Sequence, residues 1–275
     1  MLELENDRLF GNGQSELWYY VFRHIFKRLT GYSLIMSSHA HITLSFVIGL
    51  FSLLIIFSPL VSVGSTLKIY PPDSNPYGLS YGQWSQKWWE WAFEVPGEDS
   101  PINDVTGENC SLNQEGPVWF LAGTFGTSVT RECTIPEGKA LFMPADNVPV
   151  SVAEFKNLPD DEQVLKAEAE KIIDDVDIVD VEIDGVKIEN ITSYKVITDL
   201  FQLDLPQANV LGAEPGTYNF TGAGHWVFID PLSPGKHTVL LRAVTFSPEL
   251  GNPATFISEA KYNLLVASNN SSPNA

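Results

Sequence analysis

Hydrophobic and polar residues alternate along several stretches of the chain, and a period of two predicts β-strands. In TFISEAKYNLLV (255–266), Ala260 and Tyr262 share one side of the predicted strand, and charged residues occupy the other. The segment DVEIDGVKIE (180–189) also alternates, and its central Asp-Gly dipeptide predicts a tight hairpin turn. Short apolar runs between turn residues predict further strands at 117–126, 130–136 and 138–144, and a hairpin at 224–244.

A period of 3.6 residues predicts two helices. The first, SYGQWSQKWWEWAFE, begins at Ser80 as N-cap, with Gln83 completing a capping box, and ends before Pro96. Its apolar stripe opposes a polar face and is typical of a helix docked on a core. The stripe contains Tyr81, Trp84, Trp88, Trp91, Ala92 and Val95. The second helix, DDEQVLKAEAEKIIDD (160–175), carries acidic residues in its first turn.

Trp89 and Phe93 lie off this stripe, as a pair four residues apart on one helix face. Gln86 shares their side. Two interpretations stay open: the pair contacts a second layer of the protein, or it is exposed and binds a ligand. A flat aromatic ring beside polar groups suits stacking against sugar rings. Trp89, Phe93 and Gln86 are therefore the candidate ligand-binding residues.

Many short strands separated by turn residues predict a mainly β fold, a jelly-roll-like β-sandwich. An aromatic N-terminal helix and one inserted acidic helix would complete it. We expect this single domain to span 80–266. The Pro- and Gly-rich segment 65–79 is typical of a linker, and the polar segment 267–275 of a disordered tail.

Residues 42–63 contain no charged side chain and are long enough to cross a bilayer. Basic residues precede them, so we expect the rest of the chain to face outward. Two alternatives stay open. The segment is a signal peptide cleaved after Gly64, with Met36 as the true start, or it is an uncleaved membrane anchor that follows a cytoplasmic stub, 1–41. Both predict an extracytoplasmic protein, either secreted or anchored to the membrane.

The net charge of −18 disfavours binding to nucleic acid and to anionic lipid headgroups. The two cysteines, Cys110 and Cys133, are not part of a redox or zinc motif, and in an exported domain they predict one disulfide. Its loop of about two dozen residues would stabilise the fold by roughly 3 kcal/mol. Asn-x-Ser/Thr triplets mark candidate glycosylation sites at Asn109, Asn190 and Asn219.

Asp180, Glu182 and Asp184 partly match the opening of a calcium loop, and they are the candidate metal ligands. The pattern departs from that motif at Glu182, and Ile191 stands where an acidic residue is required. A solvated hairpin explains the same residues. Calcium is thus the one cofactor candidate, and no other cofactor is expected.

His225 and His237 are the histidines that follow the apolar segment. In the simplest register of the 224–244 hairpin they lie about 13 Å apart, too far for one metal ion. Either could work with a carboxylate in acid–base chemistry. Local signatures of serine hydrolases, zinc proteases and phosphate-binding loops are absent from the sequence.

The stretches YGLSYGQWSQKWWEWA (77–92), RECTIPEGKALFMP (131–144) and PLSPGKHTV (231–239) resemble a family of exported prokaryotic proteins of unknown function. The resemblance covers most of residues 70–245. It implies an export signal and one compact secreted domain, and it implies no catalytic residues.

Together these observations predict an extracytoplasmic binding module for glycan or cell-envelope partners rather than an enzyme. The alternatives are a structural surface protein and a secreted hydrolase that uses carboxylates with His225 or His237.

Overall fold

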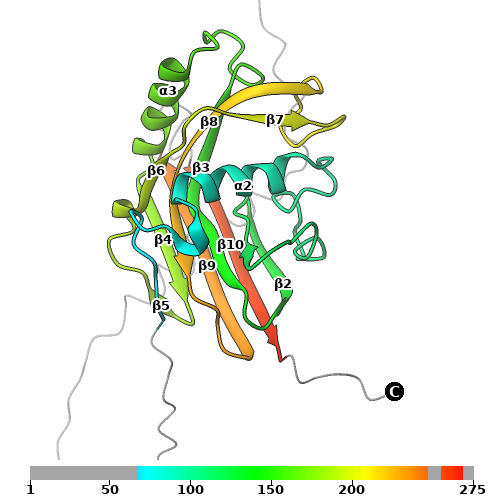
Figure 1. Ribbon diagram of the computed structural model, residues 1–275, viewed down its shortest axis with the longest axis vertical. Coiled ribbons are helices and arrows are strands. Elements are labelled where there is room, and N and C mark those ends of the chain that lie inside the picture. Colours follow the sequence, from blue (N-terminus) through cyan, green and yellow to red (C-terminus); the bar gives the residue numbers. More distant parts are fainter. Residues whose placement is uncertain (1–66, 247–254, 269–275) are drawn as a thin grey trace, which may run out of the picture. The chain divides into compact units, whose positions relative to one another are not determined.

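The computed structural model of the protein describes residues 67–246 and 255–268 (Figure 1). The predicted stub 1–41, the predicted export segment 42–64 and residues 269–275 of the predicted tail lie outside these described residues. Within the described part, ten strands form two five-stranded sheets, accompanied by two α-helices. The predicted mainly β, sandwich-like class with one aromatic and one acidic helix is confirmed. No helix in this part is long and apolar enough to cross a membrane.

The central sheet is built around two long antiparallel strands, β3 and β8. Its strands are β1 (Val118–Phe120), β3 (Ala140–Ser151), β8 (Gly216–Ile229), β6 (Lys195–Ile197) and β7 (Phe201–Leu205). β1 runs parallel to β3, whereas β6 and β7 both pair with β8. Sequence reasoning did not predict β6 or β7: β6 is only three residues long, and the short alternation FQLDL of β7 was missed.

The outer sheet has the strand order β2-β10-β9-β4-β5. Its strands are β2 (Ser128–Pro136), β10 (Thr255–Ala267), β9 (Gly235–Phe246), β4 (Ile178–Ile183) and β5 (Val186–Lys187). β10 lies between β9, which is antiparallel to it, and β2, which is parallel. The β4–β5 hairpin turns at Asp184 and Gly185, both with positive φ, as the Asp-Gly dipeptide predicts.

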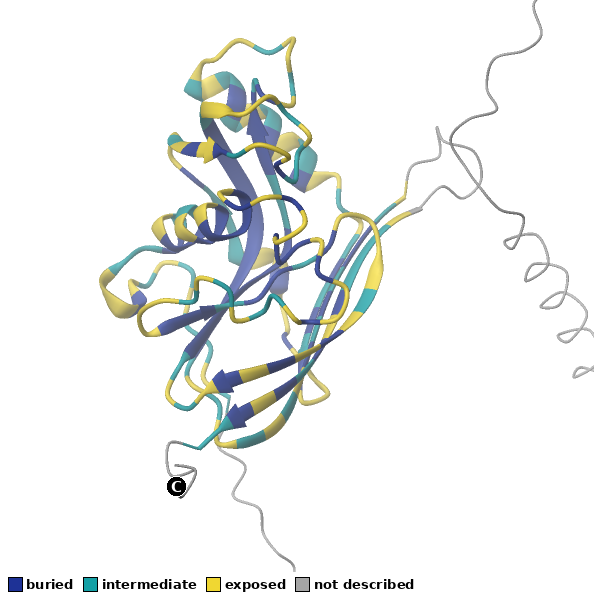
Figure 2. Cartoon of the chain, turned by 90° about the vertical axis from the view of Figure 1, so that its right-hand side faces the viewer, coloured by how far each residue is buried: buried dark blue, intermediate teal, exposed yellow. Residues whose placement is uncertain are grey.

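The main core lies between the two sheets, and a second core lies on the opposite face of the central sheet. In β3, Leu141 and Met143 face the outer sheet, whereas Phe142 faces α2 (Tyr81–Phe93). β3 and the second half of β8 are therefore buried on both faces (Figure 2). Strands β2 and β4 of the outer sheet instead alternate between buried residues and exposed or half-buried ones, since one of their faces meets solvent.

Helix α2 begins as the sequence predicts. The side chain of Ser80 accepts from the backbone N–H of Gln83, and the Gln83 side chain accepts from the Ser80 N–H. The predicted apolar stripe is buried, with Tyr81 and Trp88 each 1% exposed. The indole N–H groups of Trp84 and Trp88 donate to the backbone carbonyls of Pro76 and Leu121, so burial leaves neither without a partner.

Helix α3 (Glu162–Asp174) begins after its N-cap, Asp161. It buries Leu165, Ala169 and Ile173 against Val150 of β3 and Ala223 of β8. Because Ala223 lies on the same face of β8 as Val227, which contacts the outer sheet, α3 and the outer sheet cover the same face of the central sheet.

Two predictions of connectivity are wrong. Segment 224–244 is not a hairpin, because β8 belongs to the central sheet and β9 to the outer sheet. Residues 68–70 are not part of a linker, because the N–H of Tyr70 donates to Phe228 and Ile69 forms a bridge with Ile229. Both errors have one cause: a local pattern cannot reveal pairing with a strand that is distant in the sequence.

The predicted disulfide is confirmed: Cys110 is bonded to Cys133, with their Cα atoms 6.0 Å apart. It joins the loop before β1 to the middle of β2. The half-cystine Cys133 is buried in the core between the sheets.

Candidate functional site

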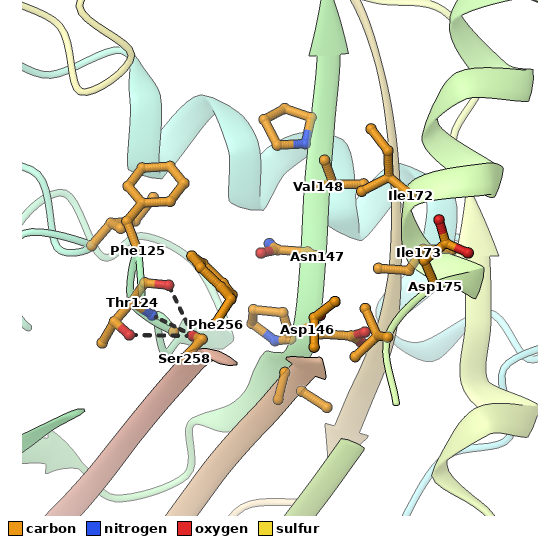
Figure 3. A pocket seen from close by; sticks show the side chains of 18 of the residues that line it. Thr124, Phe125, Asp146, Asn147, Val148, Ile172, Ile173, Asp175, Phe256 and Ser258 are labelled. Atoms are coloured by element: carbon orange, nitrogen blue, oxygen red, sulfur yellow. Dashed lines mark hydrogen bonds between the residues drawn. The ribbon is translucent and has the colours of Figure 1, made fainter. Parts of the chain in front are cut away.

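A cavity of about 420 Å³ lies at the free edge of β3; we call it the β3 cavity (Figure 3). Its lining comes from α2, the loop at Ile102, the loop after β1, residues 144–149 of β3, residues 154–155 after β3, the C-terminal end of α3, and the ends of β9 and β10 next to residues 246 and 255. Residues far apart in the sequence therefore converge on one hollow.

The edge of β3 is free because its neighbour is short. β1 pairs only with Ala140–Phe142, so β3 has no further partner strand on that side among the described residues. A bulge follows Pro144, and Pro149 lies further along. Bulges and prolines protect an unpaired edge against addition of a foreign strand. The edge thus favours a ligand that is held by side chains.

Apolar side chains form most of the cavity wall. Trp88 and Trp89 contribute from α2, Ile172 and Ile173 from α3, and Val148 from β3. At the rim, Phe125 and Phe256 are 46% and 51% exposed. Beside them, the hydroxyls of Thr124 and Ser258 lie 3.2 Å apart within hydrogen-bond distance. An apolar hollow with a few polar groups is the usual form of a small-molecule site.

Asp146 is the buried charged residue of the wall. Its Oδ1 accepts from His225 Nδ1 at 2.7 Å and from the His225 backbone N–H at 3.1 Å. Its side chain is only 5% exposed, and Oδ2 has no hydrogen-bond partner. A buried carboxylate oxygen without a donor is costly, because it has lost its water. His225 fixes the position of Asp146, but His225 is not among the residues that line the cavity.

In the described part of the chain, all charged side chains that line the cavity are carboxylates: Asp146, Glu154 and Asp175. The neighbouring residues desolvate Glu154 and so raise its pKa. Glu154 is nevertheless exposed at the surface, and the water that reaches it opposes this rise. The electrostatic character of the cavity is therefore negative.

The loop at the cavity is held by a buried arginine. Arg131 is 1% exposed, and its guanidinium donates to the carbonyls of Asp104, Ile102, Ala122 and Gly123. It also donates to the hydroxyl of Tyr262, at 2.6 Å. Burial raises the pKa of Tyr262 and keeps this hydroxyl protonated. Arg131 thus fixes Ile102 and Gly123 in the wall.

The predicted aromatic platform does not exist as an exposed surface. Trp89 is 1% and Phe93 0% exposed, and their rings meet edge to face at 5.0 Å. Both pack against the central sheet, where Gly222 leaves room for the Trp89 indole. Gln86 is partly exposed and donates to the carbonyl of Asp199. Of the three candidates, Trp89 alone lines the β3 cavity, and its Nε1 has no hydrogen-bond partner.

Two of the three candidate metal ligands, Asp180 and Asp184, have other partners. Asp180 forms ion pairs with Lys187 and Arg242. Asp184 accepts from the His237 ring at 2.7 Å and from the Thr238 N–H. In the described ranges, no group of three histidine, cysteine or carboxylate side chains is placed to hold a metal ion. The structure does not bring these candidates together as a site.

The two histidines belong to different sheets, so the register assumed for them from the sequence is wrong. Each forms its own hydrogen bond to an aspartate. His237 uses both ring nitrogens, because its Nε2 also contacts the Ser233 carbonyl at 2.8 Å. Hydrogen bonds at both ring nitrogens are typical of a histidine that stabilises a turn.

The three candidate glycosylation sites differ in accessibility. Asn190 is exposed in a left-handed turn, and its side chain does not cap the 3-10 helix that follows it. The side-chain amides of Asn109 and Asn219 donate to Glu98 and Asp160. Asn190 is thus the most accessible of the three.

Sequence reasoning missed Arg131 and Asp146, although both carry a signal. Arg131 shares the inward face of its strand with Cys133 and Ile135, so the alternation places a charge in the core. Asp146 interrupts the apolar run of 140–150. A charge at an apolar position was the clue in each case.

No protein-family model, no curated protein and no solved structure matches the chain. The resemblance to exported prokaryotic proteins therefore stays a prediction, and the function must be argued from the site itself.

Proposed function

We propose that the protein is an extracytoplasmic binding module that takes a small, mainly apolar ligand into the β3 cavity. The observation that carries this proposal is the cavity: about 420 Å³, walled by tryptophan, phenylalanine and isoleucine side chains, with a few polar groups. Cavities of this size and lining bury most of a small ligand and gain affinity from the apolar surface removed from water.

The cavity favours a different ligand from the one that the tryptophans suggest in the sequence. A glycan needs an exposed ring and many polar partners, whereas these walls are largely apolar. An apolar envelope component or another small amphipathic molecule is the better match. The Cys110–Cys133 disulfide supports an oxidising, extracytoplasmic location.

A secreted hydrolase is less well supported. The Asp146–His225 pair resembles part of a catalytic group, but His225 does not line the cavity. Among the described residues, none of the cavity hydroxyls, those of Thr124, Thr245 and Ser258, is hydrogen-bonded to His225. Acid–base catalysis requires the base within reach of the reacting group.

Binding of a neutral solvatochromic dye, Nile red, to the folded domain tests the proposal. We expect saturable binding, with a blue-shifted emission and one dye per chain. Phe256→Ala and Phe125→Ala should weaken it several-fold, because each removes an apolar rim residue that lines the cavity.

Leu265→Ala is the matched control. Leu265 lies on β10 like Phe256 and is similarly exposed, at 46%, but it does not line the cavity. The control should leave dye binding unchanged. If the dye does not bind, or if all three variants weaken it equally, the cavity is not the binding site.

A further inference from the structure

The walls of the β3 cavity carry an electrostatic preference that its apolar surface does not explain. Among the residues that the structure describes, its charged lining groups are three carboxylates, and no lysine, arginine or histidine lines it. A group of carboxylates around a cavity is not sufficient evidence for a ligand site. A second feature that points to a ligand is the state of Asp146, because its side chain is 5% exposed and one of its oxygens lacks a donor.

We propose, building on the binding function above, that the ligand of the β3 cavity has an apolar body and a protonated amine, and that the ammonium group pairs with Asp146. The ammonium would supply the hydrogen bond that Asp146 Oδ2 lacks. Figure 3 shows Asp146 directed toward the C-terminal end of α3, where Ile173 and Asp175 lie.

The surroundings of Asp146 suit this role. His225 occupies Oδ1 from one side, and Oδ2, which is buried, has no donor. The nearby cation Lys195, opposite His225 on β6, is engaged by Glu170 and Asp174. Glu154 and Asp175 add negative charge around the same hollow. The apolar body of the ligand would lie against Trp88, Trp89 and Ile172.

A displacement assay tests the preference for an amine independently of the binding proposal. Nile red is bound to the wild-type protein at pH 7 and displaced by 2-phenylethylamine, 2-phenylethanol or 3-phenylpropanoate. These ligands have similar apolar bodies and carry a positive charge, no charge and a negative charge. An alkylamine is protonated at this pH.

We expect the amine to displace the dye at a concentration roughly tenfold lower than the alcohol, the effect of one hydrogen bond to a charged group. The carboxylate should be the weakest competitor. Equal potency of the amine and the alcohol would overturn the amine proposal while the binding function stands. Failure of Nile red to bind at all would instead overturn the binding function.

Asp146→Asn identifies the partner of the amine. The new amide keeps an oxygen for His225 and places a donor where Oδ2 was, so the preference for the amine over the alcohol should disappear. Asp99→Asn removes the same charge from an exposed loop outside the cavity and should leave the preference intact. A preference that persists in Asp146→Asn would exclude Asp146 as the partner. If that variant does not fold, the comparison of the three ligands on the wild-type protein still decides the proposal.

Discussion

Removal of the Cys110–Cys133 disulfide should destabilise the domain by an amount that follows from its loop. The two cysteines are 23 residues apart in sequence. Linking them restricts the unfolded chain, and the chain-entropy relation gives about 3.4 kcal/mol at 25 °C for a loop of this length. For a domain of this size, each kcal/mol shifts the midpoint of thermal unfolding by roughly 2–4 °C. We therefore expect a fall of roughly 7–14 °C.

The variant for this test is Cys110→Ala combined with Cys133→Ala. Alanine is preferable to serine, because position 133 is buried between the sheets and a hydroxyl there would lack a partner. Denaturant unfolding followed by tryptophan fluorescence gives the free energy of unfolding. The wild-type protein treated with reductant is the second sample, and it should lose a similar amount of stability.

The loop closed by the disulfide contains β1 and the segment 123–125 that lines the cavity. Arg131 and Tyr262 hold that segment independently of the disulfide, so the reduced protein should stay folded and keep dye binding. An unchanged free energy of unfolding would refute the entropic argument. A loss of folding would show that the disulfide contributes much more than loop closure.

Two further predictions concern packing and charge. Gly222→Ala would place a Cβ 2.6 Å from Trp89 Nε1 and should destabilise the protein by about 1–3 kcal/mol. The control is Gly82→Ala, whose Cβ has no neighbour closer than 3.8 Å. In thermal melts this control should be neutral or stabilising. Burial alone would raise the pKa of Asp104, but the N–H groups of Gly107, Thr106 and Asn109, with Arg131, lower it. The stability contributed by the Asp104 carboxylate is therefore present above its ordinary pKa of 3.8 and is lost as the pH falls through the lower folded value. Asp104→Asn should lower the free energy of unfolding by about 1–3 kcal/mol at pH 7, and by progressively less below pH 4, as measured by denaturant titration. An equally large loss at acid pH would contradict this account.

Local signals predicted the elements that depend on neighbours in sequence. Ser80 and Gln83 form the expected capping box, and Asp184 and Gly185 form the expected turn, because each interaction spans a few residues. The class of fold followed from the number of such elements. The disulfide also followed, since only two cysteines were present to pair.

Pairing between distant segments could not be read from the sequence. β8 and β9 are adjacent in the chain, yet they join different sheets, and the pattern of apolar residues is the same in either arrangement. The burial of Trp89 and Phe93 depends on β7 and β8, which lie more than one hundred residues further along the chain. An amphipathic pattern shows which helix face is the most apolar, but not how many sides of the helix are covered.

The position of the cavity follows from the same long-range arrangement. β3 is buried on both faces near Phe142, where β1, α2 and the outer sheet surround it, and β1 ends at that level. Beyond it the strand continues to Ser151, and on one side no described residue pairs with it. Side chains from α2, α3 and β10 instead surround a cavity there. Burying a carboxylate at that point is costly, and the two hydrogen bonds from His225 to Oδ1 offset that cost only in part. Asp146 Oδ2, like Trp89 Nε1 and Asn147 Nδ2 of the same wall, has no hydrogen-bond partner, and on our proposal a ligand supplies the donor that Asp146 lacks.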